Sequence, residues 1–180
     1  AENFNYNNLK KFDACKFFYN KKTNNYIPKL IDVLIICESK KKNLNIEFKP
    51  NKGYEKINVH KIFELIKKIN IEIFFSTFDI ISLREISKIS INSNRSFLID
   101  TFNDYSLDDF INILKKYKAN ICGLNIELIS IDIVKKLKEN DLFVTVYSDN
   151  NIDLSRAAHC FDMGIDSIFT DNPIQLLKYL

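Results

Sequence analysis

The sequence predicts an α/β fold in which a parallel sheet curls into a barrel with helices on its outside. Strand-like and helix-like segments alternate six times with short loops between them, and each parallel crossover needs a covering helix. Polar residues gather at the C-terminal ends of the strand-like segments, where barrels place their sites. No glycine-rich phosphate loop follows any of these segments, although an open nucleotide-binding sheet usually has one. Because six units do not close a barrel of about eight strands, a doubly wound open sheet is the competing architecture.

The chain begins with a segment that predicts a packed loop. Residues 1–27 are irregular and aromatic, with turn-forming asparagines towards their end. Pro28 then begins a helix that runs to about Cys37, because proline is tolerated in the first helical turn and Leu30 and Val33 lie on one face. Residues 28–180 carry the strand and helix units.

Six short segments predict the strands, because β-branched and aromatic residues favour pleated, half-buried backbone. They are residues 44–50, 71–78, 96–100, 121–125, 142–147 and 165–170. Apolar periodicity and capping residues predict the helices that follow them. These are residues 59–69, 83–89, 107–117, 132–139, 153–163 and a final helix that starts at Pro173.

Capping residues indicate where some of these helices begin and end. Asn58 is expected to cap the helix 59–69, and Ser106 with Asp109 is a weaker form of the capping box. Gly164 can end the helix 153–163 in a left-handed turn.

Composition predicts one globular domain over residues 1–180. Hydrophobic residues make up 46% of the chain and charged residues 27%, and the length allows a substantial core. The net charge of +3 is small and the lysines are scattered, so we expect no nucleic-acid partner. No apolar run reaches about 18 residues and no secretory signal is present, so we expect a cytoplasmic protein without a membrane span. The four cysteines have no metal or redox spacing and are expected to be free thiols.

The segment 44–50, which reads L-N-I-E-F-K-P, carries the strongest candidate site. In a strand, Asn45, Glu47 and Lys49 point to one face and the apolar residues to the other. We expect both faces of this strand to be buried, so a carboxylate and an ammonium at these positions need partners such as a metal ion or a bound anion. The alternative is an edge strand with a solvated ion pair.

Six short motifs follow one another along the chain, namely F-D-A-C-K-F-F, I-P-K-L, N-I-E-F-K-P, S-T-F-D, V-Y-S-D-N and G-I-D-S-I-F-T-D-N-P. In this order and spacing they resemble the glycerophosphodiester phosphodiesterases, the bacterial cytosolic type in particular. The resemblance implies a TIM-type (β/α)8 barrel, here N-terminally incomplete with about six parallel strand–helix units. It also implies hydrolysis of glycerophosphodiesters to glycerol 3-phosphate and an alcohol, a reaction of phospholipid and glycerol metabolism.

The same resemblance implies roles for individual residues. Glu47 stands where the family has a metal-ligating glutamate, which implies a catalytic role and a divalent cation, Mg²⁺ or Ca²⁺. Lys49 stands where the family has a lysine near the phosphate, which implies a catalytic and substrate-binding role. Tyr147 stands where the family has an aromatic residue that lines the glycerol pocket, and Phe78 is an expected neighbour. The chemistry agrees, because a hard cation suits carboxylate oxygen and a cation with Lys49 would neutralise charge on phosphoryl oxygens.

The chain departs from the family in the segments that it does not contain. H-R-G, P-E-N and H-D are absent from residues 1–180, and so is the family's E-x-D at its place before F-D-A-C-K-F-F. In the family these segments supply the other metal ligands and the proton-transfer histidines. We therefore expect the C-terminal two-thirds of such an enzyme. His60 and His159 lie within predicted helices and are expected to be structural or solvent-facing. Because general acid–base catalysis typically contributes about 10²–10⁴-fold, we expect this chain to be inactive by itself.

Two further functions stay open. A degenerate barrel fragment could be a non-catalytic binding or scaffold module, and an open barrel edge would then favour self-association. An unrelated phosphate-binding α/β domain would instead hold phosphate at a helix N-terminus.

The remaining candidates have simpler interpretations. Asp171 and Asn172 are expected to be helix caps rather than ligands, and Asp100 is either a residue of the barrel mouth or a turn former. The aromatic residues of the first segment are expected to lie in the core or to plug the barrel. They are Phe12, Phe17 and Phe18.

Overall fold

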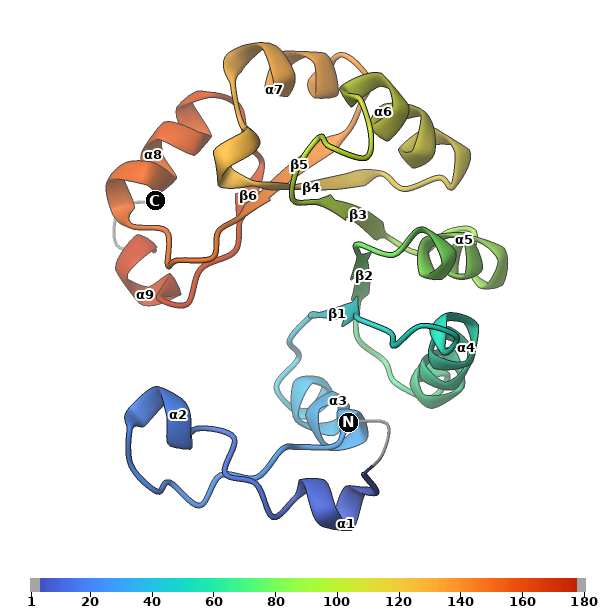
Figure 1. The fold of residues 1–180 in the computed structure, drawn as a ribbon, viewed down its shortest axis with the longest axis vertical. Coiled ribbons are helices and arrows are strands. Elements are labelled where there is room, and N and C mark those ends of the chain that lie inside the picture. The colour runs from blue at the N-terminus through green and yellow to red at the C-terminus, as the bar shows by residue number, and fades with distance from the viewer. Residues whose placement is uncertain (1–3, 178–180) are drawn as a thin grey trace.

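A computed structural model describes residues 4–177 as a curved parallel sheet with helices along its convex side (Figure 1). The domain limits predicted at residues 1 and 180 lie outside the described residues. The strands are β1 (Leu44–Phe48), β2 (Ile73–Thr77), β3 (Arg95–Ile99), β4 (Ile121–Asn125), β5 (Phe143–Tyr147) and β6 (Ser167–Ile168). They pair in parallel in the order β1-β2-β3-β4-β5-β6.

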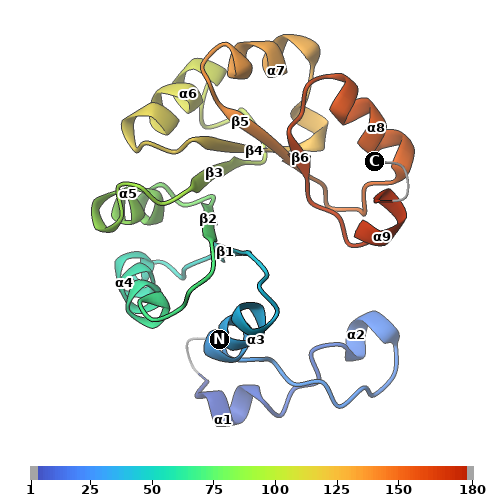
Figure 2. The ribbon, with the colours of Figure 1, turned by 180° about the vertical axis from the view of Figure 1, so that it is seen from behind.

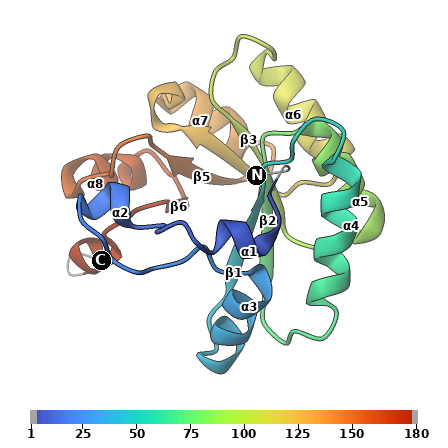
Figure 3. The ribbon, with the colours of Figure 1, turned by 60° about the horizontal axis from the view of Figure 1, so that its bottom comes forward.

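Most of the helices connect successive strands and cover the sheet. Within residues 4–177 they are α1 (Tyr6–Leu9), α2 (Lys16–Tyr19), α3 (Leu30–Ser39), α4 (Glu55–Ile66), α5 (Ile80–Ile89), α6 (Leu107–Lys116), α7 (Ile131–Lys138), α8 (Leu154–Asp162) and α9 (Pro173–Leu176). A 3-10 turn, Ile126–Leu128, follows β4. Figure 3 shows α4 and α5 side by side on the outside of β1 and β2.

The strand order decides between the two predicted architectures. Successive strands are neighbours throughout, as in a barrel, whereas a doubly wound sheet reverses its strand order. The sheet curls into a half-barrel whose two edge strands, β1 and β6, do not pair with each other (Figure 2). The predicted parallel barrel with six strand–helix units is therefore confirmed as a half-barrel.

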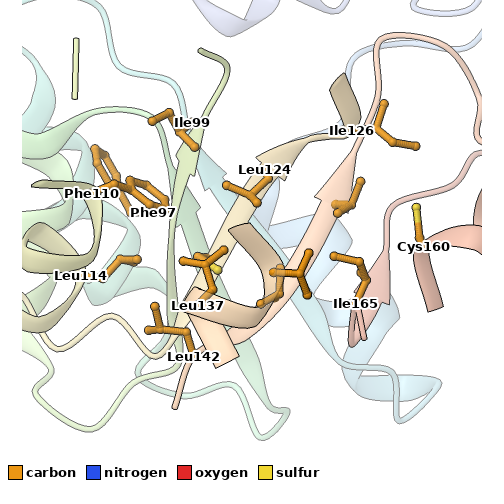
Figure 4. Close-up of a cluster of buried hydrophobic side chains, with 14 of the residues drawn as sticks. Phe97, Ile99, Phe110, Leu114, Leu124, Ile126, Leu137, Leu142, Cys160 and Ile165 are labelled. Atoms are coloured by element: carbon orange, nitrogen blue, oxygen red, sulfur yellow. The ribbon is translucent and has the colours of Figure 1, made fainter. Parts of the chain in front are cut away.

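The core lies between the sheet and its outer helices and has two parts. The larger part packs β3 to β6 against α6, α7 and α8, and it includes Phe97 and Phe110, whose stacked rings have centroids 5.6 Å apart (Figure 4). The smaller part joins β1 and β2 to α4 and α5 through Ile46, Val59 and Ile86. Both parts bury the outward-facing residues of the strands, so the inward face stays available for a site.

Several helix boundaries follow the predicted caps, and one does not. Ser106 and Asp109 form the full capping box of α6, and Gly164 has the positive φ of +93° expected after α8. The prediction that Asn58 caps a helix is wrong, because α4 already begins at Glu55. The turn before α4 leads directly into the helix, since the Glu55 carboxylate accepts a hydrogen bond from the Gly53 amide at 2.9 Å.

The predicted strand 165–170 is longer than β6, which spans Ser167–Ile168. β6 pairs only with β5, so no second strand extends its ladder. The expectation that both faces of the strand 44–50 are buried is also wrong. β1 is an edge strand, with Ile46 and Phe48 buried and Asn45 and Glu47 exposed.

The first segment is exposed rather than packed. Phe17 and Phe18 are 99% and 81% exposed and Phe12 is 55% exposed, so the prediction that they lie in the core or plug the barrel is wrong. Hydrogen bonds help to hold this segment, because the Asp13 carboxylate accepts hydrogen bonds from the backbone and hydroxyl of Thr23. An isolated bridge pairs Asp13 with Tyr26.

No helix within residues 4–177 combines the length and the apolar character needed to cross a bilayer. All four cysteines are free thiols, and Cys122 and Cys160 are buried. Burial raises the pKa of the Cys122 thiol to about 12, so this cysteine is an unreactive core residue.

Candidate active site

Glu47 and Lys49 extend from the polar face of β1 at its C-terminal end. The predicted alternation is confirmed, because the exposed positions Asn45 and Glu47 alternate with the buried positions Ile46 and Phe48. Lys49 Nζ lies 3.2 Å from Glu47 Oε1, and the two side chains are 72% and 32% exposed. An ion pair this exposed contributes little to folding, about 0–1 kcal/mol. It can therefore be broken at small cost when a ligand binds.

A cavity of about 640 Å³ opens at the C-terminal ends of the strands, and it is called the mouth cavity below. All four residues implied by the family resemblance line it, namely Glu47, Lys49, Phe78 and Tyr147. These residues come from the ends of β1, β2 and β5, so the curled sheet brings together side chains that are far apart in the sequence. Glu47 and Lys49 thus lie at the same end of the sheet as Tyr147.

Phe78 and Tyr147 form an aromatic corner of the mouth cavity. Their ring centroids are 5.6 Å apart and the ring planes meet at 86°, which is the edge-to-face arrangement that aromatic pairs prefer. The turn that carries Phe78 is fixed by buried Thr77, whose hydroxyl donates to the Phe48 carbonyl at 3.0 Å. The side chain of Asp79 then caps α5 by accepting from the Ser82 amide.

Asp100 lies between Asn125 and Tyr147 at the mouth. The Tyr147 hydroxyl donates to Asp100 Oδ1 and to the Ile99 carbonyl, both at 2.9 Å. Asn125 Nδ2 donates to the same Asp100 oxygen at 2.9 Å. Asp100 also lines the mouth cavity, so it is a residue of the barrel mouth.

The titration of this group follows from its contacts. The hydrogen bonds from Asn125 and Tyr147 lower the pKa of Asp100. Burial, followed by the charge and hydrogen bond of Asp100, raises the pKa of Tyr147. Around neutral pH, the Asp100 carboxylate is therefore ionised and accepts the hydrogen bond, and the Tyr147 phenol is neutral and donates it.

The carboxylates of the mouth do not form a complete metal site. Glu47, Asp100, Asp149 and Asp171 line the cavity, but no group of three histidine, cysteine or acidic residues within residues 4–177 is arranged to hold a metal ion. Glu47 is paired with Lys49, and Asp100 Oδ1 already accepts two hydrogen bonds. The described residues therefore do not assemble a set of three ligands for a divalent cation.

Neither histidine is at the mouth. His60 is an exposed residue of α4 whose Nε2 lies 3.2 Å from Glu85 Oε1. His159 is an exposed residue of α8. Both histidines are solvent-facing, as predicted, and neither lines the mouth cavity.

Sequence reasoning missed part of the mouth and misjudged one cap. Leu98, Ser148, Asp149 and Phe169 line the cavity without having been singled out. Ser148 and Asp149 belong to the motif V-Y-S-D-N, and Phe169 belongs to G-I-D-S-I-F-T-D-N-P, so both motifs were usable signals, whereas nothing local marks Leu98. Asp171, expected as a cap, lines the cavity instead. Asn172 is at the cap position of α9, but its side chain makes no capping hydrogen bond.

Comparison with known proteins adds a family and a fold. A sequence model of the glycerophosphoryl diester phosphodiesterase family matches residues 1–175. A search among curated protein sequences gave no match.

Solved structures resemble this chain along most of its length. One is a phosphodiesterase from Oleispira antarctica in complex with the product sn-glycerol-3-phosphate, with a TM-score of 0.86, 18% identity, and coverage of 98% of this chain and 70% of that chain. A provisionally assigned glycerophosphodiester phosphodiesterase from Galdieria sulphuraria has a TM-score of 0.83 at 17% identity, with coverage of 98% and 70%. A glycerophosphodiester phosphodiesterase from Parabacteroides distasonis has a TM-score of 0.76 at 17% identity, with coverage of 97% and 70%. At these identities the likeness shows the fold.

Proposed function

Because the chain belongs to the glycerophosphoryl diester phosphodiesterase family, we propose that its mouth cavity binds the glycerol phosphate part of a glycerophosphodiester. Membership in this family implies phosphodiesterase hydrolase activity, which yields glycerol 3-phosphate and an alcohol. The observation that carries the proposal is the convergence of Glu47, Lys49, Phe78 and Tyr147 on one cavity at the C-terminal ends of the strands.

The two sides of the cavity suit the two parts of such a ligand. Among the described residues, Lys49 is the only cationic side chain that lines the cavity, and its exposed ammonium can leave Glu47 to contact a phosphoryl oxygen. The aromatic corner of Phe78 and Tyr147 offers an apolar surface for the carbon chain of glycerol. The ligand would therefore lie with its phosphate towards β1 and its carbons towards the aromatic corner.

The family generally depends on a divalent cation. In this chain Glu47 is the residue proposed to ligate it, and Mg²⁺ and Ca²⁺ are the proposed ions because both prefer oxygen ligands. Since the described residues do not assemble a full ligand set, we expect the chain alone to bind either ion weakly.

The described residues also supply no histidine for proton transfer at the mouth. Loss of general acid–base catalysis costs about 10²–10⁴-fold in rate, so we propose that residues 1–180 alone bind the product but do not hydrolyse the substrate. The lack of a histidine among the described residues of the mouth also favours the second candidate, a non-catalytic binding or scaffold module. A cytoplasmic location is part of the proposal, in keeping with four free thiols.

A pair of measurements tests the proposal. The purified chain is incubated with glycerophosphocholine or glycerophosphoethanolamine, with Mg²⁺ or Ca²⁺ and with chelator, and it is titrated calorimetrically with sn-glycerol 3-phosphate. We expect no turnover, and binding that is tighter than that of glycerol or inorganic phosphate alone. Metal-dependent turnover that chelator abolishes would contradict the inactivity. Equal, negligible affinity for sn-glycerol 3-phosphate, glycerol and inorganic phosphate would contradict the proposed glycerol phosphate site and favour the scaffold function.

A further inference from the structure

We propose that Asp100 is a positioning residue, which anchors the Tyr147 hydroxyl and so fixes the Tyr147 ring as an apolar wall for the glycerol carbons. The inference rests on the proposed function for the identity of the ligand. The anchoring itself rests on the contacts of the Tyr147 hydroxyl with Asp100 and the Ile99 carbonyl, and on the contact of Asp100 with Asn125.

The strand register brings these residues together. Asp100 directly follows β3, while Asn125 and Tyr147 are the last residues of β4 and β5. Asn125 pairs with Tyr147 across β4 and β5, and Ile99 pairs with Leu124 across β3 and β4. The three side chains therefore extend from neighbouring strand ends, and rigid strands set their spacing.

The orientation of Asn125 is fixed from its other side. Its Oδ1 accepts a hydrogen bond from the Glu127 amide at 3.0 Å, so its Nδ2 is the atom left to donate to Asp100. Asn125 is 9% exposed, which restricts the alternatives for its side chain. The buried Asn125 amide therefore fixes Asp100 Oδ1, and this oxygen in turn accepts a hydrogen bond from the Tyr147 hydroxyl.

The Tyr147 hydroxyl has no second proton to offer. Its single hydrogen is shared between Asp100 Oδ1 and the Ile99 carbonyl, so it cannot also be donated to a ligand. Tyr147 therefore contributes its ring to the mouth cavity and not a hydrogen bond. The acidic groups that act on Tyr147, namely Asp100, Asp149 and Glu47, all raise its pKa, which keeps the phenol protonated as a donor.

The anchored ring completes the aromatic corner. With the hydroxyl held, the Tyr147 ring meets Phe78 edge to face at 5.6 Å. If the anchor were lost, the ring could rotate away from Phe78 and the wall for the glycerol carbons would loosen. The consequence for binding is therefore expected to pass through Tyr147 and not through direct contact of Asp100 with the ligand.

Three variants separate these possibilities. Asp100→Asn keeps an oxygen acceptor for both donors, Asp100→Ala removes it, and Tyr147→Phe keeps the ring but removes the hydroxyl. Two readouts are measured: the nuclear Overhauser effect between the rings of residues 78 and 147 without ligand, and the affinity for sn-glycerol 3-phosphate. The double variant Asp100→Ala/Tyr147→Phe closes a mutant cycle.

Asp100→Ala leaves the Ile99 carbonyl as the remaining acceptor for the Tyr147 hydroxyl. We therefore expect this variant to weaken the ring-to-ring signal and to lose about tenfold in affinity, equivalent to about 1.4 kcal/mol. Asp100→Asn should keep the signal and stay within about threefold of the parent affinity. In the Tyr147→Phe background, Asp100→Ala should cause no further loss.

Opposite outcomes would overturn the proposal. An intact ring-to-ring signal in Asp100→Ala would show that Asp100 does not position the ring. Additive losses in the double variant would show that Asp100 acts on the ligand directly. If the parent chain does not bind glycerol 3-phosphate, the proposed function fails, while the ring-to-ring signal still decides the positioning role.

Discussion

At the scale of single residues, the mouth cavity depends on a close approach between β3 and β4. A Cβ atom added at Gly123 would lie 2.2 Å from Leu98 Cδ2, and Leu98 lines the mouth cavity. Because position 123 has no side chain, the Leu98 side chain can lie next to it and does not extend further into the mouth cavity.

We expect Gly123→Ala to push the Leu98 side chain into the cavity and weaken sn-glycerol 3-phosphate binding by about tenfold. Gly53→Ala is the matched control, because a Cβ there meets no atom within 4 Å and only its positive φ of +89° is strained. This control should lose stability and keep its affinity. Equal affinities for both variants, measured by calorimetry, would contradict the assigned role of Leu98.

The sequence identified some mouth residues and not others for a physical reason. Glu47, Lys49, Phe78 and Tyr147 are found because strand alternation and short motifs are local signals. Leu98 belongs to no such motif, and its place in the cavity depends on the curl of the sheet, which is a property of all strands together. The anchor from Asp100 to Tyr147 joins residues 47 positions apart, so no window of sequence could indicate it.

At the scale of elements, helix α6 is an example of local control. Ser106 accepts from the Asp109 amide at 3.1 Å, and Asp109 Oδ2 accepts from the Ser106 amide at 3.3 Å. We expect Ser106→Ala to lower the free energy of unfolding by about 1 kcal/mol, the usual effect of losing a cap. Ser155→Ala, at an exposed position inside α8, should change it by less than about 0.5 kcal/mol. Urea unfolding of the two variants compares them directly, and equal effects would refute the capping role.

The first segment should respond to acid through one carboxylate. The Thr23 hydroxyl and amide, followed by the amides of Asn24 and Cys15, hold the pKa of Asp13 well below its usual range. A lowered pKa means that the ionised carboxylate stabilises the segment above the ordinary aspartate value of about 3.9, and that this contribution is lost as pH falls through the folded-state pKa.

An NMR titration of the side-chain carboxyl carbons tests this expectation. The midpoint for Asp13 should lie below the ordinary aspartate value of about 3.9, and the Thr23 amide signal should shift together with Asp13. In Asp13→Asn the Thr23 signal should already be displaced at neutral pH. An Asp13 midpoint at or above the ordinary aspartate value would show that the carboxylate does not hold the segment.

Element prediction succeeded where the signal was local and failed where it was not. The strand 121–125 and the start of α6 agree with the structure because neighbouring residues specify them. The packed loop 1–27 was predicted from its aromatic content, but an aromatic side chain is buried only where another surface covers it. Within residues 4–177, no surface covers Phe17 and Phe18. β6 is shorter than the predicted segment because it pairs with β5 only at Ser167 and Ile168.

At the scale of the whole molecule, the half-barrel exposes two sheet edges and a partly apolar inner face. Phe143 and Phe169 are 44% and 45% exposed and line an inner cavity of about 230 Å³. Unpaired edges and apolar surface both favour association. We therefore expect the purified chain to self-associate as its concentration rises.

Light scattering coupled to size-exclusion chromatography measures this association. Phe143→Lys, on the inner face, should shift the chain towards the monomer, whereas Ile131→Lys, at a 69% exposed position on α7, should not. A chain that stays monomeric over the whole concentration range would contradict the expected role of the inner face and the edges.

The location of the glycerol phosphate site is the central claim, and residue-resolved NMR during a titration with sn-glycerol 3-phosphate tests it most directly. Lys49→Ala removes the lysine ammonium group that lines the mouth cavity, and Lys52→Ala removes an exposed lysine that does not line it. We expect the ligand to shift signals of Lys49, Phe78 and Tyr147, with affinity reduced about tenfold in Lys49→Ala and unchanged in Lys52→Ala. Shifts confined to residues outside the mouth cavity, or equal losses in the two lysine variants, would contradict the account.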